Sequence, residues 1–322
     1  MKISVITCTH NRCESLQRTL DSFKGMFGLD GNSWEFIIVD NNSNDKTRII
    51  VDNFRKDFEC NIKYVFEKKQ GLSHARNSGI KNAEGEIIAF TDDDVLFDKY
   101  WLLIIQRIFE KYEVACVGGK TLPIWEIPRP KWLLSNLYGM LALLDLGDTP
   151  FYVTDPLSIF GVNFAVRAIM FKKYGDFNTN LGRTPDRLFS GEETELFFRL
   201  LHGGEKFFYC PDMIIHHCIP PTRISRDYFR RWAFDAAESN AAFLEIINHR
   251  ALRGLPNYSI ETFLRSLIRY ILGLICFSKR RFNYELRFIN QLSYFIHKKN
   301  LGAIFAKQLY NLVVLTGRLY VK

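Results

Sequence analysis

The chain has 322 residues, of which 47% are apolar and 24% charged, a composition typical of a globular protein. Its length allows one large α/β domain with an additional region. The seven cysteines are scattered and none forms a Cys-x-x-Cys pair, so the sequence predicts neither a disulfide framework nor a zinc site. We therefore expect a reducing, cytoplasmic compartment. The first residues show no signal-peptide pattern, which agrees with that expectation.

The net charge of +8 is unevenly distributed along the chain. Residues 255–322 contain 11 Lys or Arg but only two acids, and so carry a net charge of +9. Such asymmetry predicts an anionic partner, either a membrane or a nucleic acid. No recognised base-reading module is present, so we expect a membrane and no nucleic acid. Residues 263–277 are apolar but interrupted by Arg265 and Arg269, which is typical of an amphipathic helix at a membrane interface.

The first 120 residues alternate between short apolar runs and amphipathic stretches. We expect strands at residues 3–8, 34–39, 62–66, 87–90 and 114–117. We expect helices between them, at residues 15–24, 46–58, 71–83 and 99–110. This alternation predicts a mostly parallel β-sheet with helices on both faces.

The alternation ends after residue 119, where a proline-rich loop follows. Beyond this loop we expect a short apolar helix at 132–144, strands at 160–166, 207–209 and 213–216, and a helix at 192–202. From about residue 225 onward the pattern is helical. The longest uncharged stretch, 132–144, is too short to cross a membrane.

Three consecutive aspartates, Asp92, Asp93 and Asp94, follow the expected strand at 87–90. Adjacent carboxylates repel one another unless a cation lies between them, and a divalent cation is often shared between protein carboxylates and the phosphates of a substrate. Ligands of open α/β sheets bind at the carboxyl ends of the strands. On the triplet alone, solvated acids at a helix N-terminus remain an alternative to a metal site.

Polar residues follow the other expected strands of the first half as well. They are Thr9, Asn11, Arg12, Asp40, Asn42 and Arg76. An aspartate can accept from a base or a ribose hydroxyl, and an arginine can offer a planar fork to phosphate. Singly, each has a structural alternative, since Asn-Asn-Ser is also a turn sequence. Together they predict a ligand site at one edge of the sheet.

In their order along the chain, these motifs resemble the signatures of family 2 glycosyltransferases with the GT-A fold. The motifs are ISVITCTHNR at 3–12, VDNNS at 39–43, ARN at 75–77, FTDDD at 90–94, GVN at 161–163, GDF at 175–177 and SGEE at 190–193. The resemblance implies a Rossmann-like domain over residues 1–232, with a nucleotide-binding half at 1–120 and an acceptor half at 121–232. Residues 233–322 form a basic, amphipathic helical region without a match.

The resemblance also implies a role for each motif. Thr9, Asp40 and Arg76 correspond to positions that hold the base and ribose of a nucleotide-sugar, and their loops add further donor contacts. The further candidates for the donor are Asn11, Arg12, Asn42, Asp92 and Asp93. The resemblance implies Mn²⁺ or Mg²⁺ on the D-x-D motif, with Asp94 as the main ligand and Asp92 beside it. His216 aligns with a recurrent family histidine that can complete the metal shell, and His217 is the alternative.

Glu193 corresponds to the catalytic base of inverting family members, where it usually lies in a Glu-Asp pair. This chain has Glu192-Glu193 instead, so which of the two acts stays open. A base is needed because an acceptor hydroxyl has a pKa far above neutral. Both glutamates also begin the expected helix at 192–202, where acids are common for structural reasons.

The resemblance implies inverting, metal-dependent transfer of a hexose or N-acetylhexosamine from a nucleotide-diphospho-sugar, with a UDP-sugar as the expected donor. The implied acceptor is a glycan or lipid-linked hydroxyl in surface polysaccharide synthesis, at the inner face of the cell membrane. Two alternatives remain. A sugar nucleotidyltransferase would carry a Gly-rich loop after the first strand, which residues 9–12 lack. A catalytically inactive nucleotide-sugar-binding subunit would bind the donor without transferring it.

Overall fold

The computed structural model describes residues 1–26, 33–57, 61–185, 187–246, 258–276, 278, 280–298, 308, 310, 311, 313 and 314. The chain forms two compact units. The first comprises Met1–Glu126, Leu141–Pro185 and Glu192–Ile219, and the second comprises Ile127–Met140, Asp186–Gly191 and Pro220–Lys322. The predicted boundary at residue 232 falls inside helix α7 (Arg226–Ile246), so the compact units divide earlier, near residue 219.

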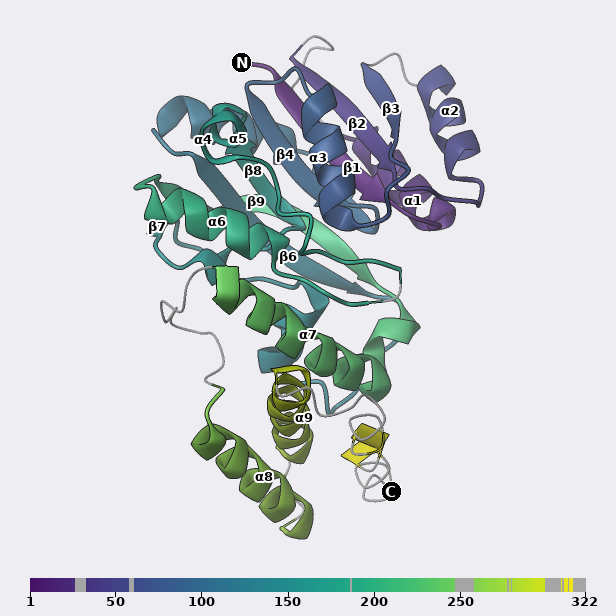
Figure 1. Ribbon diagram of the computed structural model, residues 1–322. Coiled ribbons are helices and arrows are strands. Elements are labelled where there is room, and N and C mark those ends of the chain that lie inside the picture. Colours follow the sequence, from purple (N-terminus) through teal and green to yellow (C-terminus); the bar gives the residue numbers. More distant parts are fainter. Residues whose placement is uncertain are drawn as a thin grey trace. The chain divides into compact units, whose positions relative to one another are not determined.

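One mixed β-sheet runs through the first unit (Figure 1). Its strands are β1 (Ile3–Thr9), β2 (Trp34–Asp40), β3 (Ile62–Phe66), β4 (Ile87–Asp92), β5 (Val95–Phe97), β6 (Cys116–Trp125), β7 (Phe151–Val153), β8 (Asn163–Arg167) and β9 (Phe207–Ile219). Strands β3, β2, β1 and β4 are parallel, as predicted. Strand β8 is antiparallel to β4 and β6, whereas β6 and β9 are parallel to each other. Strands β5 and β7 are antiparallel to β9.

Six α-helices belong to the first unit within the described residues. They are α1 (Cys13–Phe23), α2 (Thr47–Asp57), α3 (Leu72–Asn82), α4 (Trp101–Lys111), α5 (Ile169–Tyr174) and α6 (Glu192–His202). The helix at 192–202 was predicted with these bounds, whereas α5 was not predicted. The expected apolar helix at 132–144 is instead a 3₁₀ helix, η1 (Ser135–Leu141).

Strand β9 corrects another expectation, because the two strands predicted at 207–209 and 213–216 are one continuous element. Pro211 suggested a break between them. The register with β6 shifts at this point, where Cys210 pairs with Gly119 and Ile214 pairs with Lys120. A bulge of this kind accommodates a proline, because the residues within it do not need a ladder hydrogen bond.

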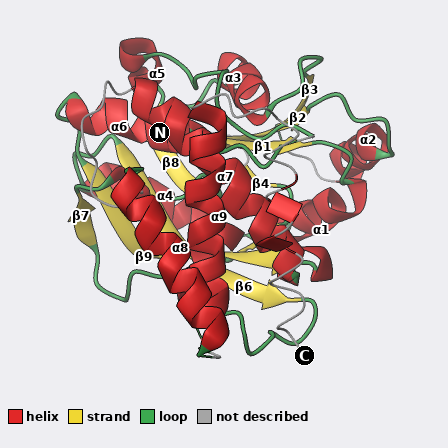
Figure 2. Ribbon diagram, turned by 60° about the horizontal axis from the view of Figure 1, so that its bottom comes forward, coloured by secondary structure: helices red, strands yellow, loops and turns green. Residues whose placement is uncertain are grey.

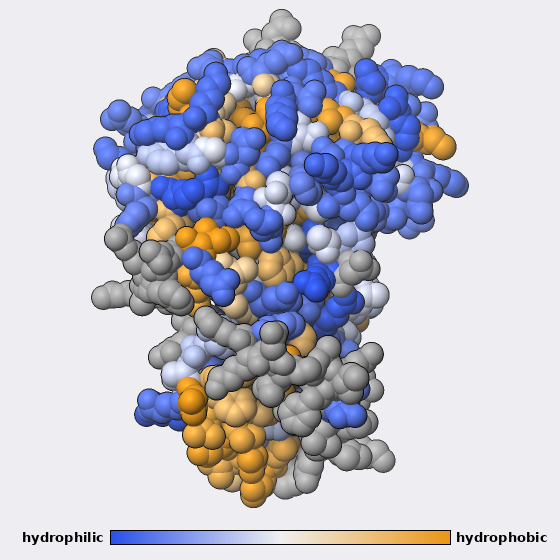
Figure 3. All heavy atoms as spheres, viewed as in Figure 1, coloured by the Kyte–Doolittle hydropathy of each residue, from blue (hydrophilic) through white to orange (hydrophobic). Residues whose placement is uncertain are grey.

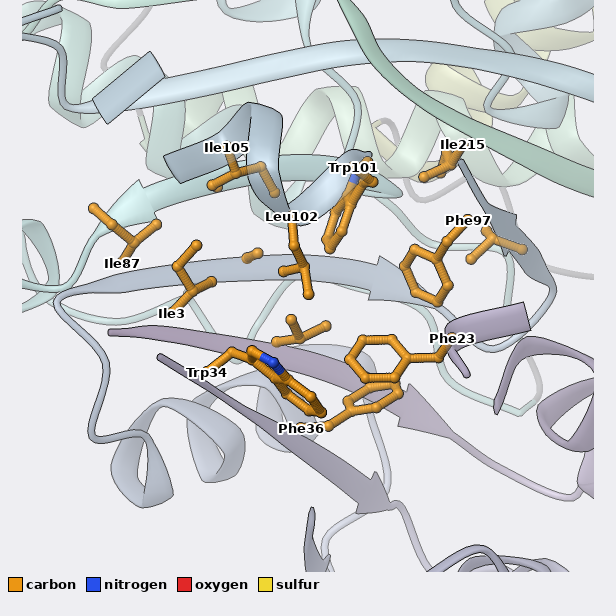
Figure 4. Close-up of a cluster of buried hydrophobic side chains, with 14 of the residues drawn as sticks. Ile3, Phe23, Trp34, Phe36, Ile87, Phe97, Trp101, Leu102, Ile105 and Ile215 are labelled. Atoms are coloured by element: carbon orange, nitrogen blue, oxygen red, sulfur yellow. The ribbon is translucent and has the colours of Figure 1, made fainter. Parts of the chain in front are cut away.

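Helices cover both faces of the sheet. Side chains alternate in direction along each strand, so every strand contributes residues to both faces. On one face, residues of α1, α2 and α4 pack against the strands, and Figure 4 shows part of this cluster, with Trp101 and Phe23 among its largest members. On the other face, residues of α3, α5 and α6 pack against alternate strand residues such as Ile6 and Phe90. The sheet is therefore buried on both faces, and the ends of its strands are the parts open to a ligand.

The second unit is helical, as predicted from residue 225 onward within the described residues. It contains η3 (Pro221–Ile224), α7, α8 (Ile260–Ile275) and α9 (Arg281–Lys298). Trp132 packs edge-to-face against Phe229 and Phe282, and Arg230 of α7 forms a buried ion pair with Glu285 of α9 at 2.6 Å. In the part of the chain that the structure describes, no helix has both the length and the apolar composition needed to cross a bilayer.

The side chain of Asn163, on β8, is hydrogen-bonded to α4, β6 and β9. Its Oδ1 accepts from the Trp101 indole at 2.9 Å, and its Nδ2 donates to the carbonyls of Lys120 and Met213 at 2.7 and 2.9 Å. The side chain is buried, so each of these groups depends on it for a partner.

We expect Asn163→Ala to destabilise the fold by about 3 kcal/mol or more, because three buried polar groups lose their partner at roughly 1–3 kcal/mol each. Urea denaturation measures this change. The exposed Asn180 offers a matched control, and Asn180→Ala is expected to leave the midpoint almost unchanged. Equal midpoints for the two variants would contradict the role given to Asn163.

Candidate functional site

The three aspartates lie at the carboxyl end of β4 and occupy three different environments. Asp92 is 32% exposed and lies 3.8 Å from Arg76. Asp93 is buried and accepts from the Thr9 hydroxyl at 2.7 Å and from Arg12 at 2.6 Å. Asp94 is buried as well and accepts from Arg12 at 2.8 Å. Arg12 thus bridges two neighbouring carboxylates that would otherwise repel each other.

Burial raises the pKa of Asp93 to about 6, although Arg12 acts in the opposite direction. Asp93 had the least defined role in the sequence. In the structure it ties the loop after β1 to the end of β4, through Thr9 and Arg12 together.

His217, not His216, faces the aspartates. The Nε2 atom of His217 lies 3.1 Å from Oδ1 of Asp94, and both side chains are only 1% exposed. Its Nδ1 donates to the carbonyl of Leu141 at 2.9 Å, which fixes the ring orientation. Because neighbouring residues of a strand point to opposite faces, His216 on β9 points away from Asp94. The expectation of His216 as the histidine beside Asp94 is therefore corrected to His217.

Asp94 and His217 fit a divalent cation. With Nδ1 as the donor to Leu141, Nε2 is the ring nitrogen of His217 that faces the Asp94 carboxylate. Adjacent ligands of an octahedral ion at about 2.1 Å are roughly 3 Å apart, which agrees with their separation. Among the described residues, no three His, Cys, Asp or Glu side chains lie close enough together to bind one metal ion. Two protein ligands would leave positions for water and a diphosphate, as is common for Mg²⁺.

Asp40, at the end of β2, holds its own loop. Its Oδ1 accepts from the backbone N–H of Ser43 at 2.8 Å, and its Oδ2 accepts from the Tyr64 hydroxyl at 2.7 Å. Burial, followed by this contact with Asp40, raises the pKa of Tyr64 to about 12. Tyr64 was not among the predicted site residues, because nothing in its own strand separates it from an ordinary core tyrosine.

Asn11 and Asn42 shape the loops after β1 and β2. Both have positive φ angles, 52° and 63°, which asparagine adopts more readily than most residues. The backbone N–H of Asn11 donates to the hydroxyl of Ser43 at 2.9 Å, and its side-chain oxygen accepts from the N–H of Asn44 at 2.8 Å. These contacts join the two loops that carry Arg12 and Asp40.

The buried Asn41 positions the start of α3, a role that the sequence did not reveal. Its Nδ2 donates to the carbonyls of Glu67 and Lys69, and its Oδ1 accepts from the N–H of Gly71 at 2.8 Å. Gly71 directly precedes α3, the helix that carries Arg76. The sequence predicted Asn42 as a donor contact, with a turn as the alternative for Asn-Asn-Ser, and gave no role to Asn41, whose side chain positions the residue before α3.

Arg76 is buried and connects the aspartates to the start of α6. It donates to Oε1 of Glu192 at 2.8 Å and to the carbonyl of Gly161 at 3.0 Å. A Cβ atom on Gly161 would lie 2.9 Å from the Arg76 guanidinium and 3.0 Å from the Glu193 carboxylate, so glycine permits this close approach. Arg76 is therefore not a surface charge, and its predicted contact with a nucleotide stays a prediction.

Glu192 and Glu193 begin α6 beside Arg76. Burial and the neighbouring Glu193 carboxylate raise the pKa of Glu192 to about 8, and Arg76 acts against this rise. The Oε2 atoms of both glutamates are buried and accept no hydrogen bond from the described residues. Two adjacent carboxylates in such surroundings favour a shared proton, because burial and mutual repulsion both disfavour the doubly ionised pair.

The family follows from the sequence match. Residues 4–174 match the family model described as glycosyl transferase family 2. The glycosyltransferase AglE of Haloferax volcanii is 33% identical over 251 residues, which cover 75% of this chain and 77% of that protein. The chain belongs to glycosyl transferase family 2. It is a glycosyltransferase, as the resemblance of its motifs implied.

The chain is also similar to a second relative and, in its fold, to a solved structure. The glucosyl-dolichyl phosphate glucuronosyltransferase of Haloferax volcanii is 23% identical over 240 residues, covering 71% of this chain and 72% of that protein. A solved mannosyltransferase of Pyrobaculum calidifontis, in complex with GDP-Man and Mn²⁺, superposes with a TM-score of 0.58 at 16% identity. The superposition covers 98% of this chain and 79% of that one, and it confirms the GT-A fold.

The raised pKa of Glu192 predicts a pH-dependent stability for this glycosyltransferase. The folded state binds the Glu192 proton more tightly than an unfolded chain with the ordinary value of 4.5. The stabilisation is therefore fully present below that value and is lost as the pH rises through about 8. We expect the wild type to lose more thermal stability over this range than Glu192→Gln, whose amide imitates the protonated acid.

Thermal melts at a series of pH values measure this difference. The exposed Glu113 provides a control, because Glu113→Gln is expected to retain the pH slope of the wild type. A slope for Glu192→Gln equal to that of the wild type would show that Glu192 is already ionised in the folded state.

Proposed function

We propose that the enzyme transfers a sugar, with inversion, from a nucleotide-diphospho-sugar to a hydroxyl of a glycan or lipid-linked acceptor. A UDP-sugar is the first donor to test. The observation that carries the proposal is the buried Arg76, which lies between Asp92 at the end of β4 and Glu192 at the start of α6. A metal–diphosphate site and a candidate base thereby share one edge of the sheet.

Asp94 and His217 are the residues that would hold Mn²⁺ or Mg²⁺. Such an ion supplies Lewis-acid stabilisation of the negative charge that develops on the departing diphosphate. Asp93 is engaged by Thr9 and Arg12, so its role in this proposal is to position the loop beside the ion. Asp92 is the most exposed of the three carboxylates and is proposed to lie next to the ribose.

Glu193 is proposed as the general base. It would take the proton from the acceptor hydroxyl while that oxygen forms a bond to the anomeric carbon and the bond from this carbon to the diphosphate breaks. One displacement from the side opposite the leaving group inverts the configuration. In this proposal Glu192 is protonated and bound to Arg76, so that no second negative charge lies next to the base.

The similar proteins support the substrate classes in this proposal. One relative is named for a dolichyl phosphate-linked acceptor, and one solved structure holds GDP-Man and Mn²⁺. A lipid-linked acceptor would bring the enzyme to the inner face of the cell membrane as a peripheral protein. The basic residues at 255–322 are the part of the chain proposed to meet anionic lipid there.

We expect Glu193→Gln to lower kcat by about 10²–10⁴ with donor affinity almost unchanged, because the amide cannot accept the proton. Glu192→Gln is the matched variant and is expected to retain most of the turnover, because the raised pKa of Glu192 favours its protonated form, which an amide imitates. Release of nucleoside diphosphate from a panel of donor sugars measures both. Retained turnover in Glu193→Gln together with loss in Glu192→Gln would move the base to Glu192.

Metal-dependent donor binding is expected to be lost in Asp94→Ala and strongly weakened, by at least about tenfold, in His217→Ala. His216→Ala serves as the control, since His216 points to the opposite face of β9 and should bind as the wild type does. Isothermal titration of UDP with and without Mn²⁺ provides the measurement. Weakening by His216→Ala, but not by His217→Ala, would contradict the assignment of the histidine.

A further inference from the structure

Helix α8 carries a continuous apolar face that is open to solvent. Six aliphatic side chains, each between 44% and 66% exposed, recur at helical spacing along it. They are Ile260, Leu264, Ile268, Ile271, Leu272 and Ile275. At 3.6 residues per turn this spacing places all six on one side of the helix, where Figure 3 shows an apolar patch. We call these six residues the α8 stripe.

The opposite side of α8 already has a partner in the same unit (Figure 2). Phe263 packs against Phe288 and Phe295 of α9, with ring centroids 5.6 and 5.2 Å apart. Tyr270 stacks on Phe288 at 5.5 Å. Because these aromatic contacts hold α8 to α9, the α8 stripe is a second apolar face in addition to the one that the fold requires.

The charge beside the α8 stripe is positive. Arg265 and Arg269, one helical turn apart, are both exposed on the flank of the stripe. Of the two acids in residues 255–322, Glu285 is buried in its ion pair with Arg230, and the exposed Glu261 pairs with Arg265 at 2.5 Å. Because both partners of this surface pair are 69% exposed, the pair is weak and Arg265 can still turn to a lipid phosphate. An apolar stripe with arginines on its flank is the arrangement of helices that lie in an anionic membrane interface.

We propose that the α8 stripe docks this enzyme on an anionic lipid bilayer, with the helix lying in the plane of the membrane. The aliphatic side chains enter the boundary between headgroups and acyl chains, and the guanidinium groups of Arg265 and Arg269 remain at the level of the lipid phosphates. At 16 residues, α8 is about 24 Å long, which is shorter than the roughly 30 Å hydrocarbon core. This inference rests on the proposed function in one respect: docking brings the enzyme to its acceptor only if that acceptor is lipid-linked.

A second copy of the chain is a poorer occupant of this face. A second copy would cover the aliphatic side chains but would add positive charge, because residues 255–322 of each copy carry a net charge of +9. A bilayer that contains anionic lipid satisfies the aliphatic face and the arginines at the same time. The composition of the α8 stripe and of its flank therefore favours lipid.

The test uses the full-length protein and its sedimentation with vesicles. Vesicles of phosphatidylcholine with about one third phosphatidylglycerol are compared with vesicles of phosphatidylcholine alone. We expect the double variant Ile268→Glu with Ile275→Glu to lower partitioning into the mixed vesicles by at least about tenfold. Ile49→Glu is the matched control, because Ile49 of α2 is 57% exposed and is expected to bind as the wild type does.

A second pair of substitutions separates the contribution of charge from that of the stripe. Arg265→Gln with Arg269→Gln is expected to weaken binding to the mixed vesicles several-fold and to reduce its dependence on salt. Circular dichroism verifies that every variant is folded. Wild-type partitioning by the Ile268→Glu and Ile275→Glu protein would overturn the proposal.

Two further measurements distinguish the other outcomes. Sedimentation velocity without lipid would overturn the proposal if the wild type were a dimer that the stripe variants convert to monomer. Donor hydrolysis in lipid-free buffer is expected to be equal in the wild type and the stripe variants, because α8 carries no proposed catalytic residue. Failure of the wild type to hydrolyse any donor would count against the proposed function and leave the vesicle result standing.

Discussion

Negative charge buried at one edge of the sheet is the constraint on which the site depends. Asp93, Asp94 and Glu192 are all nearly excluded from water. An isolated carboxylate in such surroundings would cost several kcal/mol or take up a proton. The structure uses both solutions, since burial and Glu193 raise the pKa of Glu192, and Arg12 bridges the carboxylates of Asp93 and Asp94. Arg76 lies beside Glu192, and the Nε2 atom of His217 lies beside Asp94.

The groups beside these acids must be held in place, and much of the remaining polar structure does so. Asn41 anchors the turn before α3 and thereby the helix that carries Arg76. Asn11, in its left-handed conformation, joins the loop of Arg12 to the loop after β2. The carbonyl of Leu141 orients the His217 ring. A divalent cation would therefore enter a site whose ligands are already oriented, which limits the entropy lost on binding.

How far the sequence predicts this structure depends on how local each signal is. The parallel half of the sheet and helix α6 follow from hydrophobic periodicity, which is a property of a few neighbouring residues. The three-residue strands β5 and β7 are too short to show any period, so they were missed. Without β5 and the continuous β9, the sequence could not decide which of His216 and His217 faces Asp94. The partners of Arg76, at positions 161 and 192, are separated from it by more than 80 residues and needed the tertiary structure.

Gly161 makes room for the Glu192-Glu193 pair. The usual family pair ends in an aspartate, and a glutamate at 193 carries its carboxylate one methylene further from the helix. That carboxylate lies so close to residue 161 that a Cβ there would be 3.0 Å from its oxygen. Glycine at 161 leaves room for the longer side chain and also offers its carbonyl to Arg76. A side chain at 161 would crowd this longer acid, so the glycine of the GVN motif lets Glu193 keep its carboxylate in this place although the pair departs from the family pattern.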